Sequence, residues 1–388
     1  MLTFYRDQKV SPVRQNIDDM RKHYERRRSL FRHLGLSPLA FNKRSIVEVG
    51  PCSGHNSIYT ASLLPARYCL VEGNQTGVDD IEALFKRHPE YEGVVKIYPV
   101  KFATYLSETT ERHDVVWCEN VLGGAALPKE MLRQLASLVN IGGVLVVTAL
   151  DEVSTLAESI RRVLAYAVLG GRPAAVDVES AAKMLEPILV PHLQTLTGMS
   201  RVHHDWIIDN ICLPLSGGYN ILSIPDMLET IGENFTFHSS SPRFVQDWAW
   251  YKDLVGSRAN PNRQVELAYY ENLHSFVDFR FHHSPRAEEK NRNLSSLCKA
   301  MRSEILALED KWSSEGLGTV GRLLGAIAED VQSFGPETAM ALREAREILP
   351  RVKKNPELLA NAKKFASLFG RNQQHVSFVH WGKENGLG

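Results

Sequence analysis

Short apolar runs rich in β-branched residues recur along the first part of the chain, and stretches with helical spacing separate them. The runs predict strands at residues 45–49, at a run that ends with Val71, and at 94–100, 114–118 and 142–150. Strand that alternates with helix is typical of a parallel sheet covered by helices. The pattern therefore predicts an α/β fold with a doubly wound sheet.

The pattern after residue 150 predicts an inserted segment followed by the end of the sheet. Residues 151–220 have mostly helical spacing, and residues 223–231 predict the last helix of the core. A sixth strand is predicted at 235–240 and a seventh around 247–251. Because an insertion at the carboxyl edge of such a sheet lies above the ligand crevice, residues 151–220 are predicted to form a substrate lid.

The two ends of the sequence are predicted to be helical. Residues 1–40 predict a helical cap, and helical spacing with glycine and proline punctuation continues from residue 256 toward residue 388. We therefore expect a cap at 1–40, a central domain at 41–255 and a C-terminal helical domain at 256–388. The C-terminal helices are expected to form a homodimer or to enclose the active site, and a separate binding function is the alternative.

Composition disfavours several classes of partner. The 388 residues include 45 basic and 45 acidic side chains, so no net charge attracts a nucleic acid, and a local basic face is the alternative. Five cysteines form no C-x-x-C pair, which is typical of reduced thiols in a cytoplasmic protein. No run approaches the ~20 apolar residues of a membrane span. The 14 histidines show no metal-ligand spacing, so we expect no bound metal.

The loop after the first predicted strand carries the clearest chemical signal. It runs through Gly50 and Gly54, and Glu72 closes the next strand. Gly50 allows a backbone angle that a Cβ disfavours, and Gly54 allows a ligand to lie against the peptide. A carboxylate at the end of the adjacent strand is placed to bind two ribose hydroxyls. The pattern predicts a nucleotide site, with a purely structural turn as the alternative.

The spacing of this loop distinguishes between nucleotides. A dinucleotide-binding loop needs glycine where Cys52 stands. The Glu-x-Gly-x-x-x-Gly spacing from Glu48 to Gly54 instead resembles the first motif of the class I S-adenosylmethionine-dependent methyltransferases. Residues 114–122 resemble the fourth motif of that superfamily, and Ile141-Gly142-Gly143 resembles the entry to its fifth strand. The resemblance covers about residues 41–252 and identifies the superfamily, not one enzyme.

The resemblance implies a seven-stranded, mostly parallel Rossmann-like sheet and S-adenosylmethionine as the cofactor. It also implies which residues contact that cofactor: Glu48, Gly50, Pro51, Cys52 and Gly54 at the amino-acid moiety, Glu72 and Gly73 at the ribose, Phe102 and Ala103 at the adenine, and Glu119, Asn120 and Val121 beneath the transferred methyl group.

One position departs from the family pattern. The family often carries an acidic residue after the third strand, where this chain has Lys101-Phe102-Ala103. Phe102 is expected to stack on the purine, and a pocket that holds its ligand weakly is the alternative. Glu119 and Asn120 are expected to orient the acceptor, unless their side chains serve only hydrogen bonds within the loop.

The expected substrate residues come from three segments. Tyr24 and Arg28 share one face of the N-terminal helix and are expected to reach an anionic group, although a solvated basic face is the simpler explanation of the arginines. His203, His204 and Asp205 supply a candidate general base beside a carboxylate, and Trp206 a candidate apolar wall; a helix start capped by Asp205 is the alternative. Trp250 and Tyr251 line the acceptor site or pack in a terminal hairpin.

These expectations describe an enzyme that transfers a methyl group from S-adenosylmethionine to a small or medium metabolite by in-line displacement, with help from a histidine base. Two alternatives stay open. One is an NAD-dependent oxidoreductase, which Cys52 disfavours. The other is a non-catalytic scaffold whose Rossmann-like domain holds a ligand only for structure.

Overall fold

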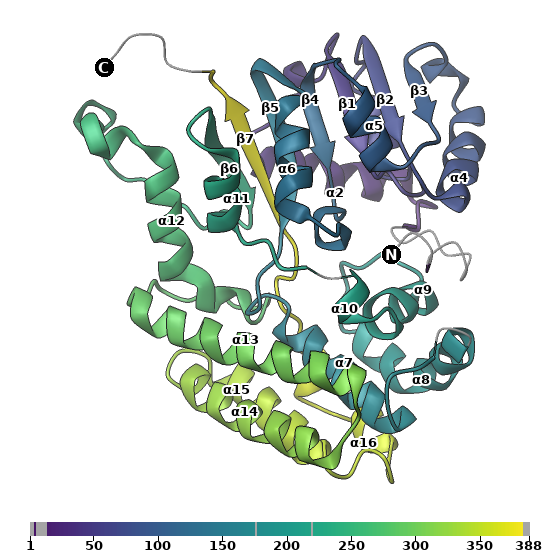
Figure 1. Cartoon of the computed structure of the whole chain (residues 1–388), viewed down its shortest axis with the longest axis vertical. Helices are drawn as coiled ribbons and strands as arrows, with labels where there is room; N and C mark the ends of the chain where they lie inside the picture. Colours follow the sequence, from purple (N-terminus) through teal and green to yellow (C-terminus); the bar gives the residue numbers. More distant parts are fainter. Residues whose placement is uncertain (1–3, 5–13, 175–176, 219, 383–388) are drawn as a thin grey trace. The chain divides into compact units, whose positions relative to one another are not determined.

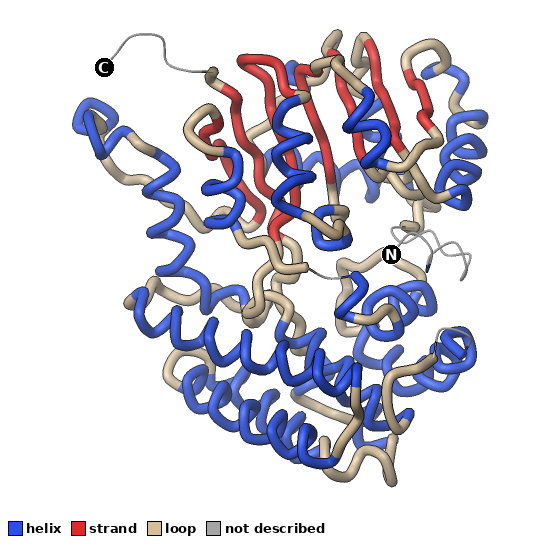
Figure 2. Tube along the Cα trace, viewed as in Figure 1, coloured by secondary structure: helices blue, strands red, loops and turns tan. Residues whose placement is uncertain are grey.

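The computed structural model describes residues 4, 14–174, 177–218 and 220–382, and it divides into two compact units (Figure 1). Unit 1 is Met1–Leu150, Asn220–Tyr269 and Gln373–Gly388, and unit 2 is Asp151–Tyr219 and Tyr270–Asn372. Unit 1 holds the sheet, whereas unit 2 is helical (Figure 2). Among the described residues, no helix combines the length and the apolar character that crossing a bilayer requires.

Unit 1 is built on one seven-stranded sheet in the order β3-β2-β1-β4-β5-β7-β6. Its first five strands are parallel, and β7 runs antiparallel to both β5 and β6. The strands are β1 Ser45–Val49, β2 Arg67–Val71, β3 Val95–Tyr98, β4 His113–Cys118, β5 Val139–Ala149, β6 Phe235–Ser241 and β7 Gln374–His380. The prediction of a doubly wound, mostly parallel sheet is confirmed.

The central strands form because their apolar residues are buried on both faces, as in other parallel sheets. In β1 and β2 every residue after the first is buried. Ile46 lies opposite Tyr68 of β2 and Val115 of β4, so both neighbours contribute to the same core. The carboxyl ends of β1, β2 and β4 consequently meet at one edge of the sheet, where the candidate residues Gly50, Glu72 and Glu119 follow.

Helices cover the sheet, and α5 and α6 cross its near face in Figure 1. The helices of unit 1 are α2 Met20–His33, α3 Ser57–Ala61, α4 Gln75–Lys86, α5 Phe102–Glu108, α6 Pro128–Ser137 and α11 Ile224–Ile231. Helix α11 begins as predicted, because the side chains of Ser223 and Asp226 cap each other's backbone. Phe31 of α2 stacks on Trp117 of β4 with 4.7 Å between ring centroids, which fixes α2 over the carboxyl half of β4.

Unit 2 is a helical body with polar groups in its core. Its helices are α7 Leu156–Leu169, α8 Val178–Leu193, α9 His203–Ile207, α10 Leu215–Gly218, α13 Glu288–Asp310, α14 Ser314–Gln332, α15 Pro336–Ile348 and α16 Glu357–Ala360, and α12 Pro261–Asn272 carries the chain into it. Buried Arg162 donates to the carbonyls of Asn210 and Ile211 and lies 3.7 Å from Glu309. This arginine thus holds the π-helical turn Ile208–Cys212.

The position of the seventh strand corrects the sequence prediction. Residues 247–251 form no strand, and Trp248 is 91% exposed. Instead Gln374–His380 is inserted between β5 and β6, with Val376 and Phe378 fully buried. The aromatic segment around Trp248 has high β-propensity but no strand to pair with, and propensity alone does not make a strand. The sheet-bearing domain therefore extends beyond residue 255 and includes a segment that was expected to be helical.

Candidate active site

The loop after β1 adopts a left-handed backbone at alternate residues. Gly50, Cys52 and Gly54 have φ angles of 78°, 53° and 72°. A Cβ at Gly50 would overlap the side chain of Val121, so only glycine fits there. Cys52 adopts this unfavourable angle because its amide donates to Glu72 Oε2 at 2.9 Å. The acid after β2 thus holds the turn after β1 in place.

Glu72 is anchored within this turn and is only 2% exposed. Its other oxygen, Oε1, accepts the amide of Asn74 at 2.8 Å. Burial raises the pKa of Glu72 to about 7, and the hydrogen bonds from Asn74 and Cys52 offset part of that increase. Each carboxylate oxygen keeps a second acceptor position, so these backbone bonds leave Glu72 able to accept from a ribose hydroxyl.

Glu48 lies deeper than the turn, within β1. It is buried and accepts a hydrogen bond from the Tyr68 hydroxyl of β2. Burial raises its pKa above the ordinary range, and the bond from Tyr68 opposes that rise. The structure therefore gives Glu48 a role in joining two strands, and its contact with a cofactor stays a prediction.

Glu119, directly after β4, gathers polar side chains from distant parts of unit 1. Arg27 of α2 donates through Nη1 to both of its oxygens, at 2.9 and 3.2 Å. Trp117 Nε1 donates to Oε2 at 3.2 Å. Nε2 of His375, in β7, lies 3.2 Å from Oε1, and the Asn56 amide lies 3.5 Å from the same oxygen. We call these five residues the Glu119 cluster.

The Glu119 carboxylate is held in its charged form. Burial alone would raise its pKa, but the charge of Arg27 and the nearby imidazole of His375 outweigh burial and hold the pKa of Glu119 well below its usual range. The guanidinium of Arg27 lies 5.5 Å from the Trp117 ring centroid and 5.6 Å from that of Phe31. These aromatic rings fix the arginine as a buried partner of Glu119.

The loops after β1 and β4 meet at Gly50 and Val121. Asn120 has a φ of 64°, and its backbone amide donates to Thr148 Oγ1 at 2.9 Å. Within the described ranges, the buried Oγ of Ser53 and Oδ1 of Asn120 have no hydrogen-bond partner. Buried polar atoms are usually satisfied, so these two atoms are suited to a polar ligand at the junction of the loops. The residues present therefore fit a nucleoside-type cofactor.

Four more residues are predicted to contact the cofactor, namely Pro51, Gly73, Phe102 and Ala103. Pro51 is buried in the turn, and Gly73 is half-buried after β2. Phe102 is half-buried and lies close to Gly50, since its ring would be 3.4 Å from a Cβ placed there. Ala103 is exposed on the first turn of α5. Their contacts with an adenine or a ribose stay predictions.

Helix α2 presents a different arginine to the site than the sequence suggested. Tyr24 packs edge-on against Tyr59 at 5.4 Å, and Arg28 is exposed. The residue that reaches Glu119 is Arg27, four positions before Phe31 on the buried face. Phe31 is apolar and lies one helical turn after Arg27, and this spacing indicates that Arg27 also faces inward. His375 was missed because its strand was predicted to be part of a helical domain.

His203, His204, Asp205 and Trp206 form most of α9 in unit 2, whereas the Glu119 cluster belongs to unit 1. His204 lies 2.5 Å from Glu186 and 3.0 Å from Glu179 through its two ring nitrogens. Burial opposes the charged ring, but these two carboxylates raise the pKa of His204. Asp205 lies in the first turn and is not the cap. The catalytic role of these residues stays a prediction.

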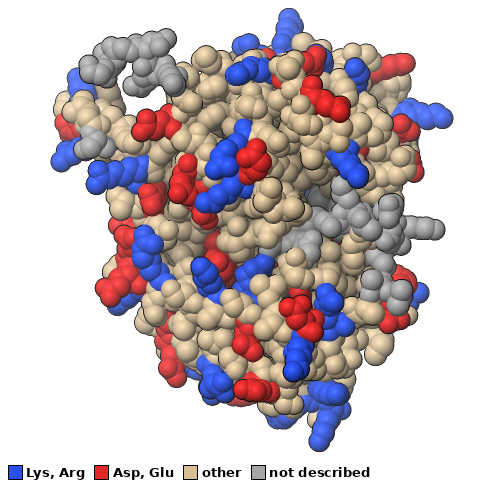
Figure 3. Space-filling view, viewed as in Figure 1, with Lys and Arg blue, Asp and Glu red and all other residues tan. Residues whose placement is uncertain are grey.

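Trp250 and Tyr251 lie in an exposed segment of unit 1. Their side chains are 59% and 71% exposed, and Lys252 lies 4.9 Å from the Trp250 ring centroid. The part of Trp250 and Tyr251 in binding an acceptor stays a prediction. On the face drawn in Figure 3, basic and acidic side chains are interspersed.

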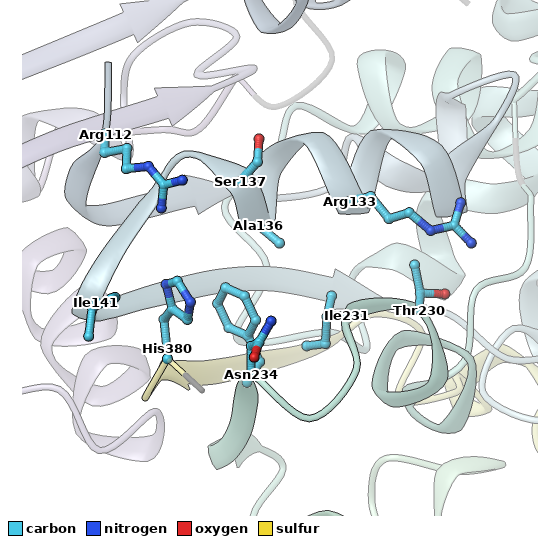
Figure 4. Close-up of a pocket in the computed structure, with 11 residues that line it drawn as sticks. Arg112, Arg133, Ala136, Ser137, Ile141, Thr230, Ile231, Asn234 and His380 are labelled. Carbon is cyan, nitrogen blue, oxygen red and sulfur yellow. The ribbon is translucent and has the colours of Figure 1, made fainter. Parts of the chain in front are cut away.

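A cavity of about 430 Å³ in unit 1 lies at the opposite edge of the sheet (Figure 4). Its wall includes Arg112 just before β4, Phe235 at the start of β6, and His380 at the end of the reversed β7. These positions define the amino edge of the parallel strands. Ligands of doubly wound sheets bind at the carboxyl edge, so this cavity is not assigned to the reaction. The described residues contain no group of three His, Cys, Asp or Glu that could hold a metal.

The strand order, with its single reversed strand, is that of the class I methyltransferase fold. Neither a known protein family nor a curated protein matches the sequence. Solved structures with a similar fold include the N-methyltransferase NodS from Bradyrhizobium japonicum WM9, at 16% identity and a TM-score of 0.30, where the match covers 38% of this chain and 74% of NodS. The fold assignment depends on the strand order and not on this likeness.

Two further solved structures are similar over comparable lengths. The CcbJ methyltransferase from Streptomyces caelestis is 20% identical with a TM-score of 0.29, over 39% of this chain and 56% of CcbJ. A precorrin-6y C5,15-methyltransferase from Geobacter metallireducens GS-15 is 20% identical with a TM-score of 0.28, over 35% of this chain and 67% of that protein.

Proposed function

We propose that this protein is an S-adenosylmethionine-dependent methyltransferase that acts on a small or medium metabolite. The observation that carries the proposal is the arrangement of three loops at the carboxyl edge. The left-handed turn after β1 is tied to Glu72 after β2, and it contacts Val121 of the loop after β4. In a doubly wound sheet these loops surround the nucleoside. The absence of glycine at Cys52 disfavours a dinucleotide.

When bound, S-adenosylmethionine supplies a methyl group already activated by its sulfonium charge. The turn from Gly50 to Gly54 would hold the amino-acid moiety, Glu72 the ribose, and Phe102 the adenine. Residues 119–121 would lie beneath the methyl group. The main work of the chain is to align the acceptor in line with the methyl group and to exclude water.

The acceptor side of the proposal involves the other predicted elements. We propose that residues 151–220 serve as the lid and that His203, His204 or Asp205 contributes a base. Tyr24, Arg28, Trp206, Trp250 and Tyr251 are proposed to contact the acceptor. A homodimer through the C-terminal helices and a cytoplasmic location belong to the same proposal.

The test is binding of S-adenosylhomocysteine, the product form of the cofactor, compared with NAD. Isothermal titration calorimetry and thermal unfolding of the intact chain should show binding of the first and none of the second. At about 100 times its Kd the ligand should stabilise the fold by ~2.7 kcal/mol. No heat and no thermal shift with S-adenosylhomocysteine would refute the methyltransferase assignment.

A matched pair of variants assigns the binding to this turn. Glu72→Ala removes the carboxylate that orders the loop and should weaken S-adenosylhomocysteine binding at least tenfold. Glu82→Ala, an exposed carboxylate on α4, should leave it unchanged. Circular dichroism establishes that both variants remain folded. Equal affinities in the two variants would place the ligand elsewhere.

A further inference from the structure

His375 is an ionisable group at the reaction edge that the cofactor site does not use. β7 is antiparallel, so its first residues lie where the parallel strands end. His375 is paired with Thr148 near the end of β5 and with Ser241 at the end of β6. Its Nε2 lies 3.2 Å from Glu119, which directly follows β4. The topology thus brings an imidazole to the loop predicted to lie beneath the transferred methyl group.

The surroundings of His375 select one tautomer. Nε2 lies 3.2 Å from the ionised Glu119 carboxylate without meeting hydrogen-bond geometry, and the nearby negative charge favours the ring proton on Nε2. This leaves Nδ1 as the acceptor of the neutral ring. Nδ1 makes no hydrogen bond within the described part of the chain, and the side chain is 18% exposed. A carboxylate that fixes the imidazole and leaves the other nitrogen free is the arrangement of a general base.

Charged and titratable groups approach this imidazole from several elements. Glu119 faces it from the end of β4, Arg27 from α2 is bound to Glu119, and Glu48 of β1 interacts with Glu119 electrostatically. Its strand partners Thr148 and Ser241 carry no charge, and His33 of α2 lies 3.1 Å from the Ser241 hydroxyl through Nδ1. A proton arriving on Nδ1 would therefore create an imidazolium next to an ionised carboxylate.

We propose that His375 is the general base of the methyl transfer and that the acceptor is a hydroxyl group. The acceptor oxygen forms a bond to the methyl carbon, the carbon–sulfur bond breaks with its electron pair going to sulfur, and the hydroxyl proton goes to Nδ1 of His375. This inference rests on the proposed function. A hydroxyl carries its proton at neutral pH and needs a base, as a thiol or a protonated amine would, whereas a carboxylate acceptor would need none.

His375 fits this role better than His204 of α9. Both ring nitrogens of His204 are within 3.0 Å of a glutamate oxygen, so His204 has no free acceptor atom. His375 shares one compact unit with the turn after β1 and with Glu72. Glu119 acts as a positioning residue for His375, and Arg27 keeps Glu119 charged.

The test follows the imidazole signals of the intact protein by carbon-edited NMR with labelled histidine, using S-adenosylhomocysteine as the probe. His375→Gln identifies the His375 signal, and His380→Gln, at the far end of the same strand, identifies a control. Saturating S-adenosylhomocysteine should shift the His375 signal and leave the His380 signal in place. Binding that leaves His375 unshifted overturns the inference while the proposed function stands. No binding at all refutes the proposed function.

A second readout tests the role of Glu119. In Glu119→Gln the ring signals of His375 in the ligand-free protein should move, because the charged partner 3.2 Å from Nε2 is lost. Unchanged ring signals show that Glu119 does not position the imidazole and overturn its positioning role. If Glu119→Gln fails to fold, the NMR comparison of ligand-free and ligand-bound wild-type protein still decides the position of His375.

Kinetics separate a base from a structural histidine. With hydroxyl acceptors such as catechol and its analogues, His375→Gln should lose roughly 10²- to 10⁴-fold in kcat and keep its KM for S-adenosylmethionine. The acidic limb of the pH–rate profile should disappear. His380→Gln should retain wild-type kcat. Equal activity of His375→Gln and wild type would overturn the assignment.

Discussion

Two buried glutamates at the ends of β2 and β4, the strands on either side of β1, have opposite pKa directions. Glu72 accepts only backbone amides, so burial dominates and raises its pKa to about 7. Glu119 is also buried, but Arg27 and His375 hold its pKa below the usual range. Glu119 is therefore charged at every physiological pH, whereas Glu72 changes its charge near neutrality.

Removing Arg27 should destabilise unit 1 strongly. Arg27→Met leaves the buried Glu119 charge without its main partner, and breaking such a pair costs about 3–5 kcal/mol. Urea unfolding measures the loss. Arg28→Met, an exposed neighbour on the same helix, should change the free energy of unfolding by less than about 0.5 kcal/mol. Similar losses in the two variants would contradict the Arg27–Glu119 assignment.

Glu72 should make the fold less stable as the pH rises. Its pKa in the folded protein, about 7, exceeds the ordinary 4.5, so the unfolded chain releases the proton first. Stability from this group is therefore lost between about pH 4.5 and pH 7, by roughly 3 kcal/mol in total. In Glu72→Gln the decrease in unfolding free energy from pH 5 to pH 8 should be smaller by most of that amount. An identical decrease would show that Glu72 titrates normally.

The residues of the turn could be predicted from sequence because glycine and acid spacing reports backbone geometry directly. Gly50, Gly54 and Glu72 lie where the spacing placed them. The spacing from Phe31 indicates that Arg27 faces inward, but its contact with Glu119 could not be found in this way, and neither could that of His375, since each reaches Glu119 from a segment far away in the chain. The partner in such a contact leaves no local pattern.

At the scale of elements, six strands follow from local patterns and the seventh does not. The first five strands and β6 have apolar runs bounded by turns, and the structure forms them near the predicted bounds. β7 also alternates, but long helical segments precede it and made a helical domain the simpler interpretation. The segment 247–251 was chosen because its aromatic residues have high β-propensity.

The insertion of β7 between β5 and β6 should make Phe378 one of the most sensitive core positions. Its side chain is fully buried and packs edge-on against Phe237 of β6 at 6.2 Å. Phe378→Ala should lower the unfolding free energy by about 3–5 kcal/mol, measured by urea unfolding. Trp381→Ala is the control, since Trp381 is largely exposed just after the strand. A small effect at Phe378 would contradict a central position for β7.

At the scale of the whole molecule, the chain crosses between the two units four times, at residues 150/151, 219/220, 269/270 and 372/373. The predicted domain boundary near residue 255 approximates the third of these transitions and does not correspond to the others. Composition and periodicity report helical content well, but they do not report which helices share a core. Helices of residues 151–219 and of 270–372 belong to one unit.

The reactivity of the cysteine thiols can measure the unfolding of each unit. All five are buried free thiols, with Cys52, Cys69 and Cys118 in unit 1 and Cys212 and Cys298 in unit 2. Native protein should not react with Ellman's reagent at pH 8, because burial excludes the reagent and raises the pKa of the thiols of Cys69, Cys118, Cys212 and Cys298. Pulsed alkylation across a urea series should modify the thiols of one unit together.

An added thiol is the positive control for that measurement. Glu82→Cys, at an exposed position of α4, should react promptly in the folded protein. Rapid reaction of native cysteines in wild type would contradict the burial of these thiols.

The place of β7 in the sheet has a consequence for biosynthesis. β5 is complete at residue 149, yet the strand that covers its edge begins at residue 374, so the ribosome must translate everything in between first. During that time the nascent sheet exposes an uncovered edge to other chains, and such edges promote aggregation. Yield in a cell should therefore depend on chaperones that shield a half-finished sheet, and on translation that reaches residue 380 without pausing.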